Sequence, residues 1–291
     1  MIAIDIGGSH ITSVQISDLS LAKMSGEINR DIVPIENRQK EAILDDWAKN
    51  INQTIASTNE FDGQITIAFP GPFDYEKGIV EVHQNNKFKP LEGVDIGREL
   101  STRINGCHHI HFENDAACFG LGEYFYGPLK TKTKMIALTI GSGIGCTFVN
   151  DGEVIRDCKD VPFGGEVYHL PYKDRSADDY FSTRWFVNQA ETYGLKVSGV
   201  RQLIEEANED VKRSIFYEFS SNFFEFFSSI ALKFGTEIII IGGNIAKSWS
   251  YFGLDLVAVF KSKGIRVERS ELGEKAICLG AAISMYNAQK K

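Results

Sequence analysis

The chain has 291 residues, which is enough for two domains of ordinary size, and its 43% hydrophobic and 24% charged residues are typical of a globular protein. The net charge of −8 argues against a nucleic-acid-binding surface. No apolar run approaches the roughly 20 residues that a membrane helix needs, and no basic and apolar leader precedes the first predicted strand. We therefore expect a cytoplasmic protein with no membrane or nucleic-acid partner.

The first predicted element is a β-hairpin around a glycine turn. Two predicted strands, residues 2–6 and 11–16, flank the turn Gly7-Gly8-Ser9-His10, and apolar residues recur at alternate positions in each. An ordinary hairpin fits this pattern as well as a phosphate-binding turn does. Asp5 favours phosphate binding, because a carboxylate at the end of an apolar strand needs a partner or a cation.

A second hairpin of this kind lies at residues 135–149. Its turn carries Gly141, Gly143 and Gly145, which let the backbone approach a ligand so that N–H groups can point at phosphate oxygens. Thr139 and Ser142 add hydroxyl donors. Two such hairpins, each opening one half of the chain, predict a duplicated architecture with a nucleotide held between two lobes.

The remaining segments alternate between helix and strand. We expect helices at 41–57, from 116 onward and at about 210–234, and strands at 64–69, 109–112 and 237–241. The turn Gly242-Gly243-Asn244 follows the last of these strands and suits contact with a flat ligand such as adenine. An ordinary strand-to-helix connection is the simpler interpretation of that turn. The alternation predicts an α/β fold in two similar lobes.

Six segments occur in the order of motifs known from one protein family: residues 5–10, 70–74, 113–116, 139–145, 164–169 and 280–282. Together they span nearly the whole chain and resemble the ROK family of bacterial sugar kinases and repressors, within the hexokinase and actin superfamily. The resemblance implies a two-lobed actin-like ATPase (ribonuclease H-like) fold, with nucleotide and sugar in the cleft between the lobes. The N-terminal lobe would comprise residues 1–116 and 275–291, and the C-terminal lobe residues 117–274.

The resemblance also implies a role for individual residues. Asp115 would be the general base that takes a proton from the attacking sugar hydroxyl. The residues implied to contact the sugar are Asn114, Glu166, His169, Gly71, Asn86 or its neighbour Asn85, and Asp178. Those implied to contact the nucleotide or its phosphates are Asp5, Gly7, Gly8, Ser9, His10, Thr139, Gly141, Ser142, Gly143, Gly242, Gly243 and Asn244. Asp5 would hold Mg²⁺ through water, since hard cations prefer oxygen ligands.

Three positions depart from the family pattern. The cysteine cluster that binds zinc in the family is absent from residues 170–177, so we expect no zinc. His10 replaces a lysine, which leaves the phosphoryl donor open between ATP and polyphosphate. Tyr168 replaces a glycine beside the implied sugar site, which leaves the preferred hexose open.

Several of these residues also have ordinary structural interpretations. His109 and His111 share a strand face, but without a third ligand nearby a metal site is the weaker interpretation. Asp74 suits a turn cap as well as a functional role. Asp115 suits the N-cap of a helix that begins at Ala116, which is compatible with catalysis. The five cysteines form no CxxC pair, so we expect buried free thiols in a reducing compartment.

The leading functional prediction is an ATP-dependent, glucokinase-like hexokinase. The alternatives are a kinase for fructose, mannose, N-acetylmannosamine or N-acetylglucosamine, and a non-catalytic sugar-sensing regulator. DNA-binding members of the family carry a helix-turn-helix ahead of the first phosphate motif, and this motif begins here at Asp5, which disfavours a repressor. The family resemblance further implies a homodimer.

Overall fold

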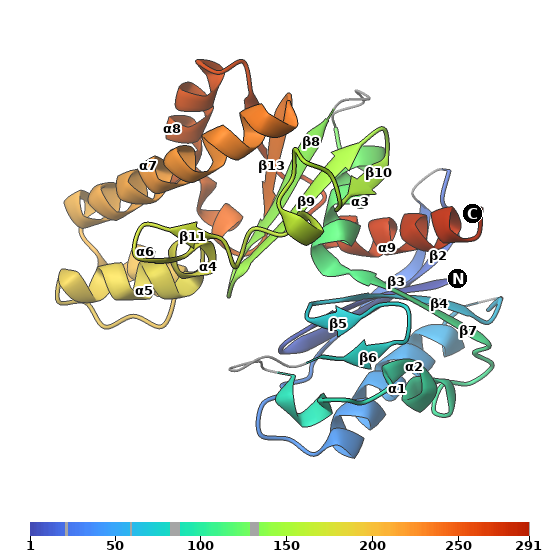
Figure 1. Cartoon of the computed structure of the whole chain (residues 1–291). Helices are drawn as coiled ribbons and strands as arrows, with labels where there is room; N and C mark the ends of the chain where they lie inside the picture. Colours follow the sequence, from blue (N-terminus) through green and yellow to red (C-terminus); the bar gives the residue numbers. More distant parts are fainter. Residues whose placement is uncertain (21–22, 59, 82–87, 129–133, 291) are drawn as a thin grey trace. The chain divides into compact units, whose positions relative to one another are not determined.

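The computed structural model describes residues 1–20, 23–58, 60–81, 88–128 and 134–290 (Figure 1). The chain divides into two compact units. Unit 1 comprises Met1–Gly122 and Lys275–Lys291, and unit 2 comprises Glu123–Glu274. The first boundary therefore lies inside helix α3 (Asp115–Tyr126), whereas the sequence places it at the start of that helix. The second boundary lies at the start of α9 (Glu274–Ala288).

Unit 1 is built on a five-stranded sheet with the order β3-β2-β1-β4-β7. Its strands are β1 (Ile2–Gly7), β2 (His10–Asp18), β3 (Lys23–Ile32), β4 (Gln64–Phe69) and β7 (His109–Asn114). The first three strands are antiparallel neighbours, and β1, β4 and β7 are parallel. The predicted first hairpin and the predicted strands at 64–69 and 109–112 are thus confirmed.

Helices cover both faces of this sheet (Figure 1). Helix α1 (Lys40–Ala56) buries its apolar residues in one cluster with Ile65 and Ile67 of β4. The alternate residue Thr66 points to the opposite face, where its hydroxyl donates a hydrogen bond to the Ala281 carbonyl of α9 at 2.9 Å. The smaller elements of unit 1 are β5 (Phe73–Asp74), β6 (Ile79–Val80), η1 (Lys89–Leu91) and α2 (Ile96–Ser101).

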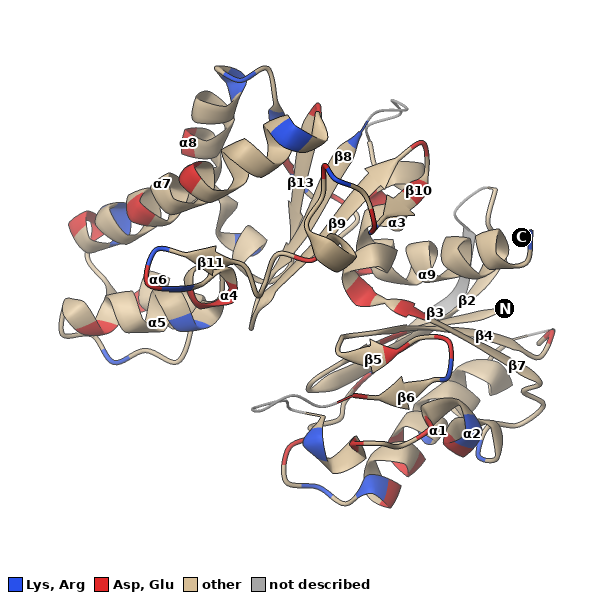
Figure 2. Cartoon of the chain, viewed as in Figure 1, with Lys and Arg blue, Asp and Glu red and all other residues tan. Residues whose placement is uncertain are grey.

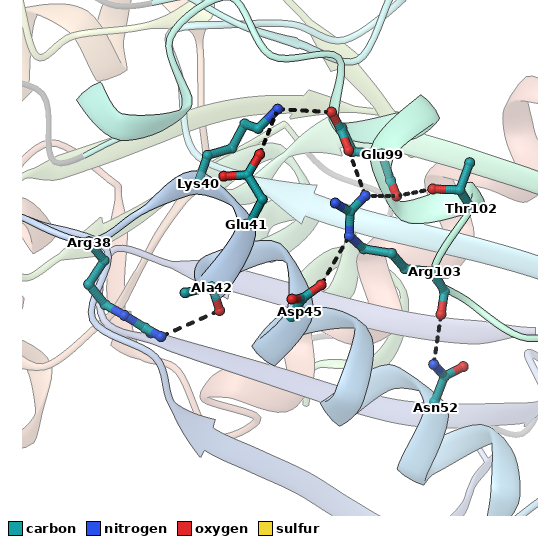
Figure 3. A network of polar contacts seen from close by, with 9 residues as sticks. All are labelled: Arg38, Lys40, Glu41, Ala42, Asp45, Asn52, Glu99, Thr102 and Arg103. Carbon is teal, nitrogen blue, oxygen red and sulfur yellow. Dashed lines mark hydrogen bonds and ion pairs between the residues drawn. The ribbon is translucent and has the colours of Figure 1, made fainter.

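A network of charged side chains joins α1 to α2 and the turn after it (Figure 3). The Glu99 carboxylate accepts hydrogen bonds from Lys40 Nζ at 3.1 Å and from Arg103. Arg103 Nε also donates to Asp45 at 3.2 Å. These contacts hold α2 and the turn after it against α1.

Helices α3 and α9 cross within unit 1 at residues without side chains. A Cβ atom on Gly280 would lie 1.7 Å from the Cys118 carbonyl oxygen, and one on Gly122 would lie 1.9 Å from the Ala276 carbonyl oxygen. Both glycines are therefore required for the helix backbones to approach this closely. The segment 280–282, which the sequence associates with the family, lies at this crossing.

Unit 2 repeats the sheet of unit 1, with the order β10-β9-β8-β13-β14. Its strands are β8 (Met135–Ile140), β9 (Ile144–Asn150), β10 (Glu153–Ile155), β13 (Ile238–Gly242) and β14 (Arg266–Arg269). In each unit an antiparallel three-stranded meander is followed by two strands parallel to its first strand. The duplicated architecture predicted from the two hairpins is confirmed.

The helices of unit 2 pack through phenylalanines. These helices are α4 (Ala177–Tyr180), α5 (Thr183–Thr192), α6 (Val200–Glu206), α7 (Glu209–Phe234) and α8 (Trp249–Lys261). The short elements of unit 2 are η2 (Phe163–Gly165), β11 (Pro171–Tyr172), β12 (Arg175–Ser176) and η3 (Ile245–Ser248). Phe227 of α7 is fully buried, and Phe224 packs edge-on against Phe260 of α8 with ring centroids 5.1 Å apart. Helix α7 is therefore buried on two sides.

Charged residues of both signs are interspersed along the elements of both units (Figure 2). Among the described residues, no helix is long and apolar enough to cross a membrane.

Cys118, Cys146 and Cys278 are buried free thiols, and burial raises the pKa of Cys118 and Cys146. Cys107 is half-buried and Cys158 is exposed, so the expectation that all five cysteines are buried is wrong. Cys158 lies in the turn after β10, where exposure costs a small side chain little.

Candidate active site

The loops of unit 1 that carry the predicted site residues leave one edge of its sheet. Strands β1, β4 and β7 are parallel, so their carboxyl ends lie at the same edge. Gly7, Phe69 and Asn114 are the last residues of these strands. Ligands of open α/β sheets bind outside this edge. The structure thus brings together the first glycine turn, the segment with Gly71, and Asp115.

Asp5 is buried near this edge of the sheet, in register with residues of β4 and β7. Its register partner on β4 is Ala68, and Ala68 pairs in turn with Glu113 of β7. Asp5 is only 4% exposed, and its carboxylate lies 3.5 Å from His10 Nε2. His10 is therefore the partner that the sequence required for this carboxylate. A Cβ atom on Gly7 would lie 2.4 Å from the His10 ring, so only glycine leaves space for the imidazole.

Helix α3 begins at Asp115, one residue earlier than predicted, and Asn114 is its capping residue. Asn114 Oδ1 accepts a hydrogen bond from the Ala117 N–H at 3.0 Å, and Asp115 Oδ1 accepts one from the Ala116 N–H at 2.8 Å. The interpretation of Asp115 as the N-cap is therefore wrong, because Asn114 reaches the first turn from the strand end. The half-buried Asp115 carboxylate lies in the first turn of this helix.

Glu113 anchors the end of β7, a role that sequence reasoning missed. Its carboxylate accepts hydrogen bonds from the Asn114 N–H at 2.7 Å and from the Ser284 hydroxyl of α9 at 3.1 Å. Ser284 Oγ lies 3.0 Å from His111 Nε2. Burial lowers the pKa of His111, and the nearby Glu113 carboxylate opposes this shift. His111 is thus part of a packing contact with α9.

Asp74 holds the turn between β5 and β6. Its Oδ1 accepts hydrogen bonds from the N–H groups of Glu76 at 3.2 Å and Lys77 at 3.0 Å, and its Oδ2 pairs with Lys77 Nζ at 2.8 Å. The hydrogen bond from the Lys77 ammonium lowers the pKa of Asp74. These contacts are those of a turn cap. Gly71 is exposed just after β4, and Asn85 and Asn86 lie outside the described residues.

Unit 2 carries the second and third glycine turns on the corresponding edge of its own sheet. Strands β8 and β13 are parallel neighbours, and Gly141-Ser142-Gly143 and Gly243-Asn244 directly follow them. Gly243 has a φ of +85°, and a Cβ atom on it would lie 2.5 Å from the Ile140 carbonyl oxygen. Gly243 therefore packs directly against the backbone at the end of β8, next to the second glycine turn. Asn244 is exposed and its Oδ1 accepts a hydrogen bond from Lys247 Nζ at 2.9 Å.

The second glycine turn is fixed by residues from the start of the helical layer. Asp178 Oδ1 accepts a hydrogen bond from the Ile144 N–H at 2.8 Å, and the hydroxyl and N–H of Thr183 both donate to the Gly141 carbonyl, at 2.9 and 2.7 Å. Arg184 pairs with the other Asp178 oxygen at 2.6 Å. Asp178, which the resemblance assigns to the sugar, supports the phosphate-type turn in this structure. Arg184 is a cation at this turn that the sequence did not single out.

Glu166, Tyr168 and His169 follow η2 in the same unit. Burial raises the pKa of the half-buried Glu166, while His169 and Arg156 oppose that shift. The Tyr168 ring lies edge-on to His169 with centroids 5.1 Å apart. The Asp178 N–H donates to the Tyr168 carbonyl at 3.1 Å, which connects this segment to the support of the second glycine turn.

Within the parts of the chain that the structure describes, no group of three or more His, Cys, Asp or Glu side chains is arranged to hold a metal ion. His109 is exposed, and His111 bonds to Ser284. The expected lack of zinc stays a prediction, which elemental analysis of the purified protein tests. A single carboxylate such as Asp5 suits Mg²⁺, because that ion keeps several of its waters in most protein sites.

Comparison with a solved structure defines the class of fold. The inorganic polyphosphate/ATP-glucomannokinase from Arthrobacter sp. strain KM superposes with a TM-score of 0.73 at 25% identity, over 99% of this chain and 98% of that one. Together with the repeated sheets, this similarity shows the two-lobed actin-like ATPase fold and confirms the predicted fold class.

The family follows from the sequence itself. The model of the ROK family matches residues 1–285, so the chain belongs to the ROK family. It is 25% identical to the glucokinase of Thermotoga maritima over 224 residues, which are 76% of this chain and 65% of that protein. It is 24% identical to the N-acetyl-D-glucosamine kinase of Vibrio cholerae over 151 residues, which are 50% of this chain and 48% of that protein. The matched segments thus span less than two thirds of either relative.

Proposed function

We propose that this protein is a sugar kinase that transfers a phosphoryl group from ATP to a hydroxyl group of a hexose. One observation carries the proposal. The half-buried Asp115 carboxylate stands at the N-terminus of α3, on the sheet edge from which the glycine turn after Asp5 also leaves. Membership of the ROK family and the kinase names of the similar proteins support it.

Asp115 would act as the general base. A sugar hydroxyl is a poor nucleophile at neutral pH, so phosphoryl transfer needs it positioned in line and relieved of its proton. A carboxylate can accept that proton as the bond to phosphorus forms. The bond from the Ala116 N–H occupies Asp115 Oδ1, which fixes the orientation of the carboxyl group.

Glu166, His169 and Asn114 would bind other hydroxyls of the sugar. Glu166 is half-buried, so a hydroxyl that it binds replaces water that the carboxylate would otherwise keep. A buried polar group that loses its partner is costly, so such contacts discriminate strongly between sugars. Tyr168, 41% exposed beside His169, would limit the space around the sugar.

The glycine turns would bind the nucleotide. Backbone N–H groups of Gly7-Gly8-Ser9 and Gly141-Ser142-Gly143 would donate to phosphate oxygens, with the hydroxyls of Ser9, Ser142 and Thr139 beside them. Gly242-Gly243-Asn244, which packs on the second turn at Ile140, would contact the adenosine. Bound Mg²⁺ neutralises charge on the transferring phosphoryl group. Asp5 would hold this ion through water, since its carboxylate supplies the oxygen donor that Mg²⁺ prefers.

Glucose is the first candidate substrate and ATP the first candidate donor. The similar proteins are named for glucose, for N-acetyl-D-glucosamine, and for glucose and mannose with polyphosphate or ATP. We therefore keep mannose, fructose and the N-acetylhexosamines as alternative acceptors and polyphosphate as the alternative donor. A homodimer is also proposed, as the family resemblance implies.

The experiment that tests the proposal is a panel of hexoses and N-acetylhexosamines, each with ATP–Mg²⁺ or polyphosphate. A coupled assay measures ADP release, and the melting temperature reports sugar binding, because a ligand of the native state stabilises it. We expect sugar-dependent ADP release with at least one hexose, and a higher melting temperature with the same sugar. If no sugar stimulates ADP or phosphate release and none raises the melting temperature, the protein is not a sugar kinase.

A further inference from the structure

The side-chain amide of Asn114 is held at both ends within unit 1. Its Oδ1 accepts a hydrogen bond from the Ala117 N–H at 3.0 Å, and its Nδ2 donates one to the Tyr75 hydroxyl at 3.0 Å. Tyr75 directly follows β5, 39 positions before Asn114 in the chain. The contact therefore joins the β5–β6 turn to the residue next to the proposed base.

The direction of these hydrogen bonds fixes which way the amide points. The Tyr75 hydroxyl donates to the Phe69 carbonyl at the end of β4, at 3.1 Å. A carbonyl oxygen can only accept, so the single hydroxyl hydrogen of Tyr75 is used there and its oxygen must accept from Asn114. The atom of Asn114 that faces Tyr75 is therefore the nitrogen. The Ala117 N–H independently requires the oxygen at the other end, so two bonds select the same amide orientation.

The Tyr75 ring is itself held by an aromatic cluster. Its centroid lies 5.2 Å from that of Phe73, which packs against Phe69 at 4.4 Å and Phe112 at 5.1 Å. These rings come from β4, β5 and β7, the strands around the proposed sugar-binding edge. Because the ring position depends on this packing, replacing Tyr75 by Phe removes the hydroxyl and leaves the ring in place.

Asn114 has a hydrogen left to donate. An amide nitrogen carries two N–H groups, and the hydrogen bonds found among the described residues use one of them. Asn114 is half-buried and directly precedes Asp115, the proposed base, in the chain. An ionised Asp115 accepts a hydrogen bond from one sugar hydroxyl, whereas this N–H can only donate to a sugar oxygen.

We propose that Tyr75 is a positioning residue that fixes Asn114 as a hydrogen-bond donor to one sugar oxygen and so sets part of the sugar specificity. The inference rests on the proposed sugar kinase function and deepens it. When the Tyr75 hydroxyl is removed, Asn114 keeps its bond to Ala117 but loses the constraint on its nitrogen. The loss of one neutral hydrogen bond predicts an effect of about three- to tenfold on sugar binding.

The first test compares Tyr75→Phe with Tyr193→Phe as a matched control. Tyr193 follows α5 in unit 2, and its hydroxyl lies 2.7 Å from the Ser214 hydroxyl at an exposed site. Each variant is assayed for kcat and KM with the best sugar and with its monodeoxy analogues. Tyr75→Phe should raise the sugar KM about three- to tenfold and leave kcat within about twofold. Its preference for the full sugar over one monodeoxy analogue should shrink, whereas Tyr193→Phe should behave as wild type.

A second variant keeps the inference testable if Tyr75→Phe folds poorly. Asn114→Asp keeps an oxygen for the Ala117 N–H but replaces the donor with an acceptor, so it should raise KM for the full sugar and lose the same discrimination. Adding Tyr75→Phe to Asn114→Asp should then cause no further loss of discrimination, because both act through one N–H.

The results separate this inference from the function on which it rests. If the wild-type protein shows no sugar-dependent turnover, both the proposed function and the inference about Tyr75 are wrong. An active wild type with an unchanged KM in Tyr75→Phe overturns the inference alone. A melting temperature that falls in Tyr75→Phe while KM rises equally for the full sugar and all monodeoxy analogues makes Tyr75 a purely structural residue, which also overturns it.

Discussion

Unit 1 and unit 2 share one sheet order but present different chemical groups at the corresponding edge. In unit 1 this edge carries carboxylate and amide side chains beside its glycine turn, with Asp5 in β1, Asn114 at the end of β7 and Asp115 directly after it. In unit 2 glycines lie at the ends of two neighbouring strands, with Gly141 directly after β8 and Gly242 at the end of β13. The repeated sheet therefore determines where a site lies, and the residues near the strand ends determine which chemical groups it presents.

The two edges are also supported differently. In unit 1 the side chains at the end of β7 are held by the first turn of α3, through the bonds from Ala116 and Ala117, and by Ser284 of α9. The turn of unit 2 is held by Asp178 and Thr183, which occupy a backbone N–H and a carbonyl. We therefore propose that the side chains of unit 1 carry proton transfer and that the turn of unit 2 contributes backbone groups to phosphate binding. The predictions below test that division.

The largest effect is expected from Asp115→Asn. Asparagine is nearly isosteric and can still accept the Ala116 N–H, but it cannot take a proton from the sugar. Turnover should fall by about 10²-fold or more, with an unchanged melting temperature. Sugar binding measured by calorimetry should stay within about tenfold of wild type, or about 1.4 kcal/mol. If the variant keeps near-full turnover, Asp115 is not the base and another residue must accept the proton.

The second prediction concerns two glycines of the unit 2 turn. A Cβ atom on Gly143 would lie 2.6 Å from Asp178 Oδ1, whereas one on Gly141 would meet nothing within 4 Å. Gly143→Ala should lower the melting temperature and raise the KM for ATP about tenfold, because it displaces the carboxylate that holds Ile144.

Gly141→Ala is the matched variant in the same turn. It should leave the melting temperature unchanged and still raise the KM for ATP several-fold, because its methyl group would occupy space that the phosphate needs. If Gly141→Ala leaves both quantities at their wild-type values, the turn does not receive phosphate.

A smaller effect is expected from His10→Lys. A lysine would restore a fixed positive charge beside Asp5, in place of the imidazole that lies over Gly7. Charge attraction near a partly exposed phosphate path is worth about 1 kcal/mol, so the KM for ATP should fall about three- to fivefold, with little change in kcat. A higher KM would show that the imidazole itself contacts the donor. The same pair of proteins, assayed with polyphosphate, shows which donor depends on residue 10.

The smallest effect is on stability and involves no ligand. Burial lowers the pKa of His111 below its ordinary value near 6.5, so the unfolded chain binds this proton more tightly than the folded protein. The corresponding stability is fully present above about pH 6.5 and is lost as the pH falls toward the lowered pKa. His111→Gln should therefore weaken the loss of stability between pH 7 and 5, measured by denaturant unfolding. If the variant loses stability over the same pH range and to the same extent, protonation of His111 does not cause this loss.

The sequence predicts the fold well where the signals are local. Glycine turns between strands of alternating polarity identify both hairpins from a few adjacent residues, and their recurrence predicts the duplication. Helix α9 was not predicted, because its residues from Ala276 to Met285 are buried almost without interruption and show no polar face. The close approach of Gly280 to Cys118 explains this pattern, and it depends on packing between distant segments.

The candidate site was predicted less completely for the same reason. The resemblance identifies Asp115 and the glycine turns, whose residues are adjacent in the chain. Asp178 bonds to Ile144 across 34 positions, and Ser284 bonds to Glu113 across 171. Tyr75 reaches Asn114 across 39 positions, with no motif to mark it. Residues that act by holding other residues are recognised only when the fold brings them together.

The identity of the phosphorylated product tests the central claim most directly. The wild-type protein is incubated with ATP–Mg²⁺ and the best hexose of the panel, and ³¹P NMR follows the γ-phosphoryl group. The account predicts one sugar phosphate for each ATP consumed, formed at least about 10²-fold more slowly by Asp115→Asn. Inorganic phosphate as the only new product, or sugar phosphate formed equally fast by Asp115→Asn, would contradict it.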